Sequence, residues 1–205
     1  MNDEMTNVYT DNSAYPSDNF IKKEIIPHLN YLAVLICIML TVFLLLFRVV
    51  VVDGSSMYDT LVHGDYVLLL NSWLAGEPQQ GDIVVASKNA YADGTPIIKR
   101  VIATEGQTVD INFDTAEVFV DGVLLDEPYI HTPTDLFQGV SFPLVVDEGC
   151  IFVLGDNRGV SKDSRNPQIG LIDCREIVGK AIFILFPGEN PAVSKRELDR
   201  IGVVK

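Results

Sequence analysis

The chain has 205 residues, with 15 Lys and Arg against 28 Asp and Glu, and a formal net charge of −13. This negative balance disfavours a general nucleic-acid-binding protein, which needs a cationic face for phosphate groups. A hydrophobic share of 48% excludes a wholly disordered chain, and three cysteines cannot form a dense disulfide framework. Because the chain is acidic but has a mean hydropathy of +0.24, its apolar residues must gather in a core or in one block.

The first apolar block follows a polar tail. Residues 1–28 are rich in Asn, Asp, Ser and Tyr, and we expect them to form a disordered tail. Residues 31–47 have Thr41 as their only clearly polar member, and no polar stripe recurs at helical spacing. About 20 residues in a helix cross a hydrocarbon layer of ~30 Å, so the range 29–50 is predicted to be a transmembrane helix.

The residues around this block bear on its processing and orientation. A cleaved signal peptide would have a cationic start and small residues at its cleavage site, whereas here an acidic segment precedes the block and bulky valines follow it. We therefore interpret the block as an uncleaved signal-anchor. Lys22 and Lys23 precede it, Arg48 follows it, and no further Lys or Arg occurs before Lys88. By the positive-inside rule, the chain is predicted to be a single-pass plasma-membrane protein with a cytoplasmic N-terminus and an external domain over residues 51–205.

The external domain has the pattern of a mainly β protein. Its short β-branched runs alternate with turn pairs such as Asp121-Gly122, which predicts an antiparallel sheet or barrel. The stretch from about 107 to 148 carries several prolines and is predicted to be a cap region inserted into this core. Neither a glycine-rich phosphate loop nor a metal-ligand cluster occurs, so we expect no cofactor and no metal site. The predicted strands are 66–70, 83–85, 97–102, 108–111, 118–120, 151–154 and 177–185.

Two segments of the external domain carry candidate catalytic residues. Ser56 lies eight residues after Arg48, a distance of at most ~28 Å in an extended chain, so it must act close to the membrane. Gly54 would allow backbone amides to approach an oxyanion closely. Lys99 would project from a strand between Ile97 and Val101, where desolvation lowers the pKa of a lysine toward the range of a base. Taken alone, the segment of Ser56 is more simply interpreted as a Ser-rich turn, and Lys99 as a surface lysine.

A third segment, residues 155–170, follows the apolar run 151–154 and is dense in Asp, Arg and Ser. In this order after one N-terminal span, the three segments resemble the type I signal peptidases, and the likeness covers nearly everything from Val49 to Pro187. The third segment is the most specific of the matches. The matching motifs are Ser56-Met57 with Thr60-Leu61, Gly81–Val84, Lys99–Ile102, Gly155–Arg158 with Ser161–Arg165, and Gly179–Ala181.

The resemblance implies a catalytic Ser-Lys dyad. It also implies the β fold shared by signal peptidases and SOS-repressor proteases. Ser56 would attack the scissile carbonyl, and neutral Lys99 would take its proton and later protonate the leaving amine. Ser161 would hydrogen-bond Lys99 and orient it, with Asp163 and Arg165 as support.

The resemblance also implies a substrate and an environment. Gly54, Ser55 and Met57 would form the substrate and oxyanion region, with the Ser56 amide as one oxyanion donor. Some relatives have a serine hydroxyl at the position of Gly54. Gly54 has no hydroxyl, so any second donor to the oxyanion must come from elsewhere in this chain. The implied substrates are signal peptides of secretory preproteins, with small residues before the cleavage site. We further expect a monomer that contacts the lipid bilayer and no nucleic acid.

One departure from the family pattern keeps alternatives open. Asp59 stands where the family usually has Pro, and it places an anion near the nucleophile. A catalytically impaired relative acting as an anchored β binding module is therefore an alternative. A self-cleaving SOS-repressor-type protease is another, although its DNA-binding segment is replaced here by the span. His63 could also serve as a base for Ser56, and Cys150 and Cys174 could pair or remain thiols.

Overall fold

The structure is a computed structural model that describes residues 21–87 and 94–204. The chain divides into two compact units, Met1–Leu44 and Leu45–Lys205, which are described separately. The predicted disordered tail covers residues 1–28, of which residues 1–20 lie outside the described residues. Residues 21–28 are helical, contrary to that prediction.

The first unit is dominated by one apolar helix. After a π-helical turn, η1 (Ile21–Ile25), helix α2 (Ile26–Leu46) runs for 21 residues without a single buried side chain. By length and composition, α2 is able to cross a membrane. The helix begins and ends earlier than the predicted range 29–50. Residues 47–50 belong to strand β1 (Phe47–Val51), because the β-branched valines of this stretch pair with the next strand.

The second unit is built on one large antiparallel sheet. Its strand order is β1-β2-β11-β3-β4-β9-β10, with β14 paired to β11. A cavity is lined by residues of β1 and of β4, which are separated by three strands in this order, so the sheet curls on itself. The strands of this sheet that follow β1 are β2 (Tyr66–Asn71), β3 (Ile83–Ala86), β4 (Ile97–Thr104), β9 (Cys150–Leu154), β10 (Ile172–Asp173), β11 (Ile177–Phe186) and β14 (Gly202–Val203).

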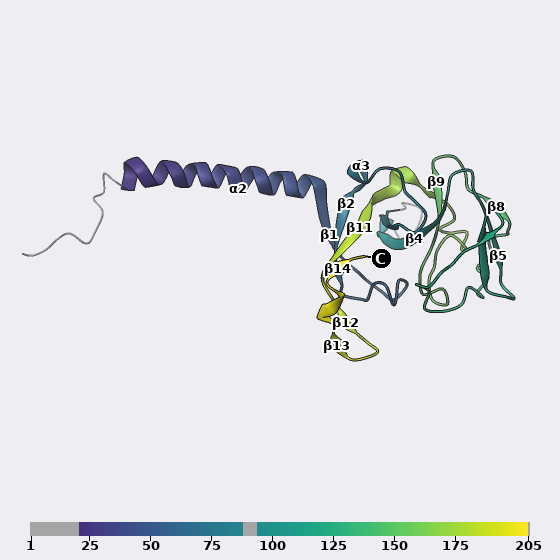
Figure 1. Cartoon of the computed structure of the whole chain (residues 1–205). Coiled ribbons are helices and arrows are strands. Elements are labelled where there is room, and N and C mark those ends of the chain that lie inside the picture. Colours follow the sequence, from purple (N-terminus) through teal and green to yellow (C-terminus); the bar gives the residue numbers. More distant parts are fainter. Residues whose placement is uncertain (1–20, 88–93, 205) are drawn as a thin grey trace, which may run out of the picture. The chain divides into compact units, whose positions relative to one another are not determined.

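A smaller sheet occupies the stretch predicted to be an insertion. Its four antiparallel strands have the order β7-β6-β5-β8, and Figure 1 shows β5 and β8 on the far side of β9 from β1 and β2. Phe152 and Leu154 of β9 pack in one apolar cluster with Val109 of β5 and Val118 of β6, which joins the two sheets. The remaining elements are β5 (Thr108–Asn112), β6 (Glu117–Val120), β7 (Val123–Leu124), β8 (Leu144–Val145), the hairpin β12 (Glu189–Asn190) and β13 (Lys195–Arg196), and the short helices α3 (Ser72–Ala75), η3 (Cys174–Glu176) and η4 (Leu198–Arg200).

The predicted fold class, an N-terminal apolar helix followed by a mainly β domain, is confirmed. A second apolar cluster fills the curl of the large sheet. Val67 and Leu69 of β2, Val85 of β3 and Ala181 of β11 contribute to it. The loop after β1, which carries Ser56, contributes buried residues to this cluster.

Candidate active site

The loop that carries Ser56 is fixed by apolar side chains on either side of it. Met57 and Leu61 are buried in the cluster inside the curled sheet, and the Leu61 amide donates to the Met57 carbonyl over 2.8 Å. Ser56, half-buried, follows the exposed residues Gly54 and Ser55. The sequence assigned Met57 to the substrate region. Its side chain instead lies in the core, so its contribution at the site is to anchor the loop.

Lys99 reaches Ser56 from strand β4, across the curl of the sheet. Its Nζ donates to Ser56 Oγ over 2.9 Å and to the Ile98 carbonyl over 2.9 Å. Only 5% of Lys99 is exposed, and this burial lowers its pKa to about 8, although Asp163 and Asp156 act in the opposite direction. A buried lysine whose pKa is lowered toward neutral pH and which contacts a hydroxyl can act as a general base.

The turn after β9 holds the backbone of the Ser56 loop through Asn157. The Asn157 amide donates to the Ser56 carbonyl over 3.0 Å, and its side-chain Nδ2 donates to the Ser55 carbonyl over 3.1 Å. Gly155 allows this close approach, because a Cβ there would lie 2.5 Å from the Ser56 carbonyl oxygen and 2.2 Å from Ser161 Oγ. The sequence placed Asn157 within a motif but assigned it no task.

The three predicted supporting residues lie together in this turn, which is buried. Asp163 and Arg165 form a fully buried ion pair, and Asp163 Oδ2 also accepts from the Gly155 amide over 3.1 Å. Ser161 differs from the expectation. Its Oγ is buried beside Gly155 and makes no hydrogen bond within the described residues, so the predicted bond to Lys99 is not formed.

A second buried ion pair links β4 to the same turn, and it was not predicted. Arg100 donates through Nε and Nη2 to the two carboxylate oxygens of Asp156, over 2.9 and 2.7 Å. The Thr60 hydroxyl also donates to Asp156, and the Arg100 guanidinium lies 3.9 Å from the centre of the Tyr129 ring. This pair therefore connects the strand of Lys99, the turn after β9 and the end of the Ser56 loop.

A segment between β7 and β8 of the smaller sheet wraps around the turn after β9. Within residues 127–140, which we call the strap, Glu127 pairs with the buried Arg158 and the Thr132 hydroxyl accepts from the Gly159 amide. Farther along, Gln138 Nε2 donates to the Ser161 carbonyl over 2.7 Å, and the Val140 amide donates to the Arg165 carbonyl over 3.1 Å. No local pattern of residues indicates these contacts, because each joins residues more than 20 positions apart.

The other candidate residues do not join Ser56. His63 Nδ1 accepts from the Gly54 amide over 3.2 Å and lies 3.3 Å from an Asp53 carboxylate oxygen. No hydrogen bond between His63 and Ser56 is found in the described part of the chain. Cys150 and Cys174 are not joined by a disulfide, and burial raises the pKa of the Cys174 thiol.

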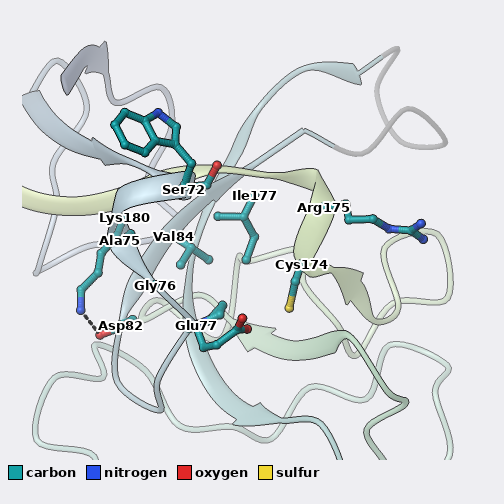
Figure 2. A pocket seen from close by; sticks show the side chains of 12 residues that line it. Ser72, Ala75, Gly76, Glu77, Asp82, Val84, Cys174, Arg175, Ile177 and Lys180 are labelled. Carbon is teal, nitrogen blue, oxygen red and sulfur yellow. Dashed lines mark ion pairs between the residues drawn. The ribbon is translucent and has the colours of Figure 1, made fainter. Parts of the chain in front are cut away.

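Among the cavities that adjoin the curled sheet are one at Ser56 and one beside α3. The first has a volume of about 390 Å³, opens at Ser56 and Lys99, and is walled by apolar residues of β1 and β4. The second, of about 290 Å³, lies beside α3 and is drawn in Figure 2. Figure 2 shows Val84 and Ile177 within it and the Lys180–Asp82 ion pair, 2.6 Å long, at its edge. The residues lining the first cavity are Val50, Val51, Val52, Asp53, Ser56, Val85, Thr95, Pro96, Ile97, Ile98 and Lys99.

Comparison with known proteins is consistent with this geometry. Residues 25–186 match the family model described as signal peptidase, peptidase S26. Signal peptidase I T of Bacillus subtilis is 38% identical over 76% of this chain and 81% of its own length, and signal peptidase IB of Staphylococcus aureus is 34% identical over 82% and 92%. A crystal structure of a signal peptidase I from Enterococcus faecalis is 29% identical and covers 51% of this chain and 96% of its own, with a TM-score of 0.42. The extent of the family match and of the two aligned relatives shows that this chain belongs to the signal peptidase family, peptidase S26.

Proposed function

We propose that this chain is a membrane-anchored serine endopeptidase that removes signal peptides from secreted preproteins with a Ser56–Lys99 dyad. The observation that carries the proposal is the 2.9 Å contact between Lys99 Nζ, which is buried, and Ser56 Oγ. Relatives named signal peptidase I, aligned over most of the chain, support the choice of substrate.

The dyad would act by nucleophilic and general acid–base catalysis. Lys99 in its neutral form takes the proton of the Ser56 hydroxyl while Oγ bonds to the scissile carbonyl carbon. The Ser56 amide supplies one hydrogen bond to the resulting oxyanion. As the C–N bond breaks, protonated Lys99 gives its proton to the leaving amine, and an acyl ester on Ser56 remains. Water, deprotonated by Lys99, then hydrolyses this ester and restores the dyad.

The supporting residues would act through the dyad and not on the substrate. Asp163 and Arg165 hold the turn that carries Gly155 and Ser161. Ser161 is buried beside the Ser56 carbonyl, which suits a hydroxyl that restricts the space around the dyad. Its lack of a hydrogen bond to Lys99 leaves burial as the main cause of the lowered pKa of Lys99.

The cavity at Ser56 suits a short extended peptide. Strand β1 is at the edge of the large sheet, so its free side offers backbone groups to which a peptide can add as a strand. Val50, Val52 and Ile98 narrow the cavity with branched apolar side chains. Such a wall favours small apolar residues before the cleavage site.

The family and helix α2 together indicate a membrane-anchored protein. We further propose that its N-terminus is cytoplasmic, that its domain acts as a monomer on the opposite side, and that α3 touches the bilayer. Asn71, directly before α3, donates to the Leu45 carbonyl over 3.3 Å, which ties this short helix to the end of the apolar run. Trp73 and Leu74 of α3 are exposed, and residues 66–76 carry no charge. An uncharged apolar surface is able to approach a bilayer even though the chain as a whole is acidic.

The test compares two pairs of substitutions in the full chain, reconstituted in vesicles and assayed on a preprotein. Ser56→Ala and Lys99→Ala are each expected to lower the cleavage rate by about 10³-fold or more. Ser141→Ala and Lys195→Ala, at exposed positions away from the site, should leave the rate unchanged. Unchanged cleavage by both dyad variants would overturn the proposal and favour the anchored binding module.

A further inference from the structure

The loop that carries Ser56 is tied to the strap at a point outside the dyad. Asp59 Oδ2 lies 3.1 Å from His131 Nδ1. Because a carboxylate has no proton to give, Nδ1 is the donor of this hydrogen bond. The neighbouring Tyr58 ring meets the His131 ring edge-on, with 4.7 Å between the ring centres.

His131 is itself held by the turn after β9. Its backbone amide donates to the Asp156 carbonyl over 2.9 Å, and the next residue, Thr132, donates from its hydroxyl to Asn157 Oδ1 over 3.2 Å. Asp156 and Asn157 in turn contact the Ser56 loop, through the Thr60 hydroxyl and the Ser56 carbonyl. The loop, the turn and the strap therefore form a closed circuit of hydrogen bonds.

The Asp59–His131 contact closes this circuit. Without this contact, the hydrogen bonds of the circuit would connect the Ser56 loop only to the turn after β9, through Thr60 and Asn157. The carboxylates whose charges raise the pKa of Lys99 are Asp163 and Asp156, both in the turn after β9. The carboxylate of Asp59 is thus directed to the strap and not to the dyad.

We propose that His131 is a positioning residue for Ser56, and that Asp59 is the group through which it acts. This inference rests on the proposed function of the Ser56–Lys99 dyad. The pair keeps the loop in the register that places Ser56 Oγ within 2.9 Å of Lys99 Nζ. Neither Asp59 nor His131 lines the cavity at Ser56, so losing the pair affects kcat and leaves KM unchanged.

The effect is modest because both side chains are accessible to water. Asp59 is 65% exposed and His131 is 40% exposed at their side chains. Contacts of this kind correspond to changes of about two- to fivefold in a rate. Their exposure also means that the substitutions leave the fold intact, which a thermal unfolding curve of each variant verifies.

The experiment separates the hydrogen bond from the ring contact. His131→Phe keeps a ring against Tyr58 but removes the donor, whereas His131→Asn keeps a donor at the δ position and removes the ring. With the full chain in vesicles and a peptide substrate, His131→Phe and Asp59→Ala are each expected to lower kcat about two- to fivefold at constant KM. His131→Asn is expected to retain the parent kcat.

A double substitution completes the test. If the two residues act as one unit, Asp59→Ala combined with His131→Phe lowers kcat no further than the stronger single change. Parent kcat in both single variants, multiplying effects in the double variant, or an effect confined to KM would each overturn the inference. Ser56→Ala is run in the same assay. Cleavage by that variant would contradict the proposed dyad, a result distinct from any outcome at His131.

Discussion

Lys99 is the residue whose environment is most unlike that of a free side chain. Strand β4 alternates its faces, yet residues 99–103 are all buried, because β3 and β9 pair with it on both sides and the smaller sheet covers it further. The amine is thus removed from water, and within the described residues it donates to Ser56 Oγ and the Ile98 carbonyl and not to a carboxylate. Desolvation outweighs the charges of Asp163 and Asp156, and the pKa falls from 10.5 to about 8.

The pH dependence of kcat/KM should report this lowered pKa. Since the neutral amine is the base, activity is lost as the pH falls below the pKa and reaches a plateau above it. We expect kcat/KM to rise about tenfold per pH unit below pH 7 and to level off above a midpoint near 8. The measurement uses a peptide without titratable groups beside the cleavage site.

The matched control for this profile is His63→Gln. His63 contacts Gly54 and Asp53 and not the Ser56 hydroxyl, so the rising limb should persist in that variant. A profile that is flat between pH 6 and pH 9 would contradict the assignment of Lys99 as the base. Loss of the limb in His63→Gln would assign the base to the histidine.

At the scale of single residues, the sequence predicted candidate site residues where they belong to a motif of the family. Ser56 contacts Lys99, and Asp163 pairs with Arg165 in the turn after β9, while the catalytic roles of these residues stay predictions. Asn157 stood inside the same motif, but its contact with the Ser56 loop spans about 100 positions, and nothing local indicates it. The hydrogen bond of Ser161 was predicted from the family pattern and is not formed here.

At the scale of elements, the strap is a segment whose position could not be predicted from the pattern of residues. Runs of β-branched residues indicated strands β2, β3, β4, β5, β6, β9 and β11 at nearly their observed positions. The Asp121-Gly122 turn indicated the hairpin of β6 and β7. The two-residue strands β8 and β10 and the strap carry no such signal, because their conformation is set by long-range partners. The strap's contacts with Arg158, Ser161 and Arg165 depend on where the smaller sheet docks.

The attachment of the strap should be measurable as stability. Arg158 is fully buried and pairs with Glu127, which is almost as buried. Glu127→Ala leaves an uncompensated guanidinium in the interior, and we expect a loss of about 3 kcal/mol in the free energy of unfolding. Urea unfolding of the full chain in detergent, followed by far-ultraviolet circular dichroism, provides the measurement.

The control for this prediction is an ion pair of similar geometry on the surface. Arg175 pairs with Asp173, but 89% of the arginine side chain is exposed, so Arg175→Ala should leave the unfolding midpoint almost unchanged. If Glu127→Ala unfolds at the same urea concentration as Arg175→Ala, the strap is not held by its buried pair. Its docking would then depend on backbone contacts such as that of Val140 with Arg165.

At the scale of the whole molecule, the apolar run and the catalytic loop are joined by a single strand. Leu46 ends α2, Phe47 begins β1, and Ser56 follows β1 by five residues. The register that pairs Phe47 with Leu70 brings the start of α3 to the same end of the sheet. We therefore propose that a chain anchored by α2 holds α3 close to the surface of the bilayer. The proposal rests on hydrogen bonds within the second unit, such as that of Asn71 with Leu45.

The proposed contact of α3 with lipid can be read from one residue, because Trp73 is the only tryptophan of the chain and 65% of it is exposed. In vesicles whose acyl chains carry bromine, which quenches nearby indoles, the emission of the full chain should fall well below its value in unbrominated vesicles. The matched control moves the indole to another exposed position by combining Trp73→Phe with Phe137→Trp in the strap. In that control, the emission should be the same in both kinds of vesicle. Equal quenching of the two proteins would show that α3 is no closer to the acyl chains than the strap is. The domain would then be held at the membrane by its anchor alone, with no contact of its own.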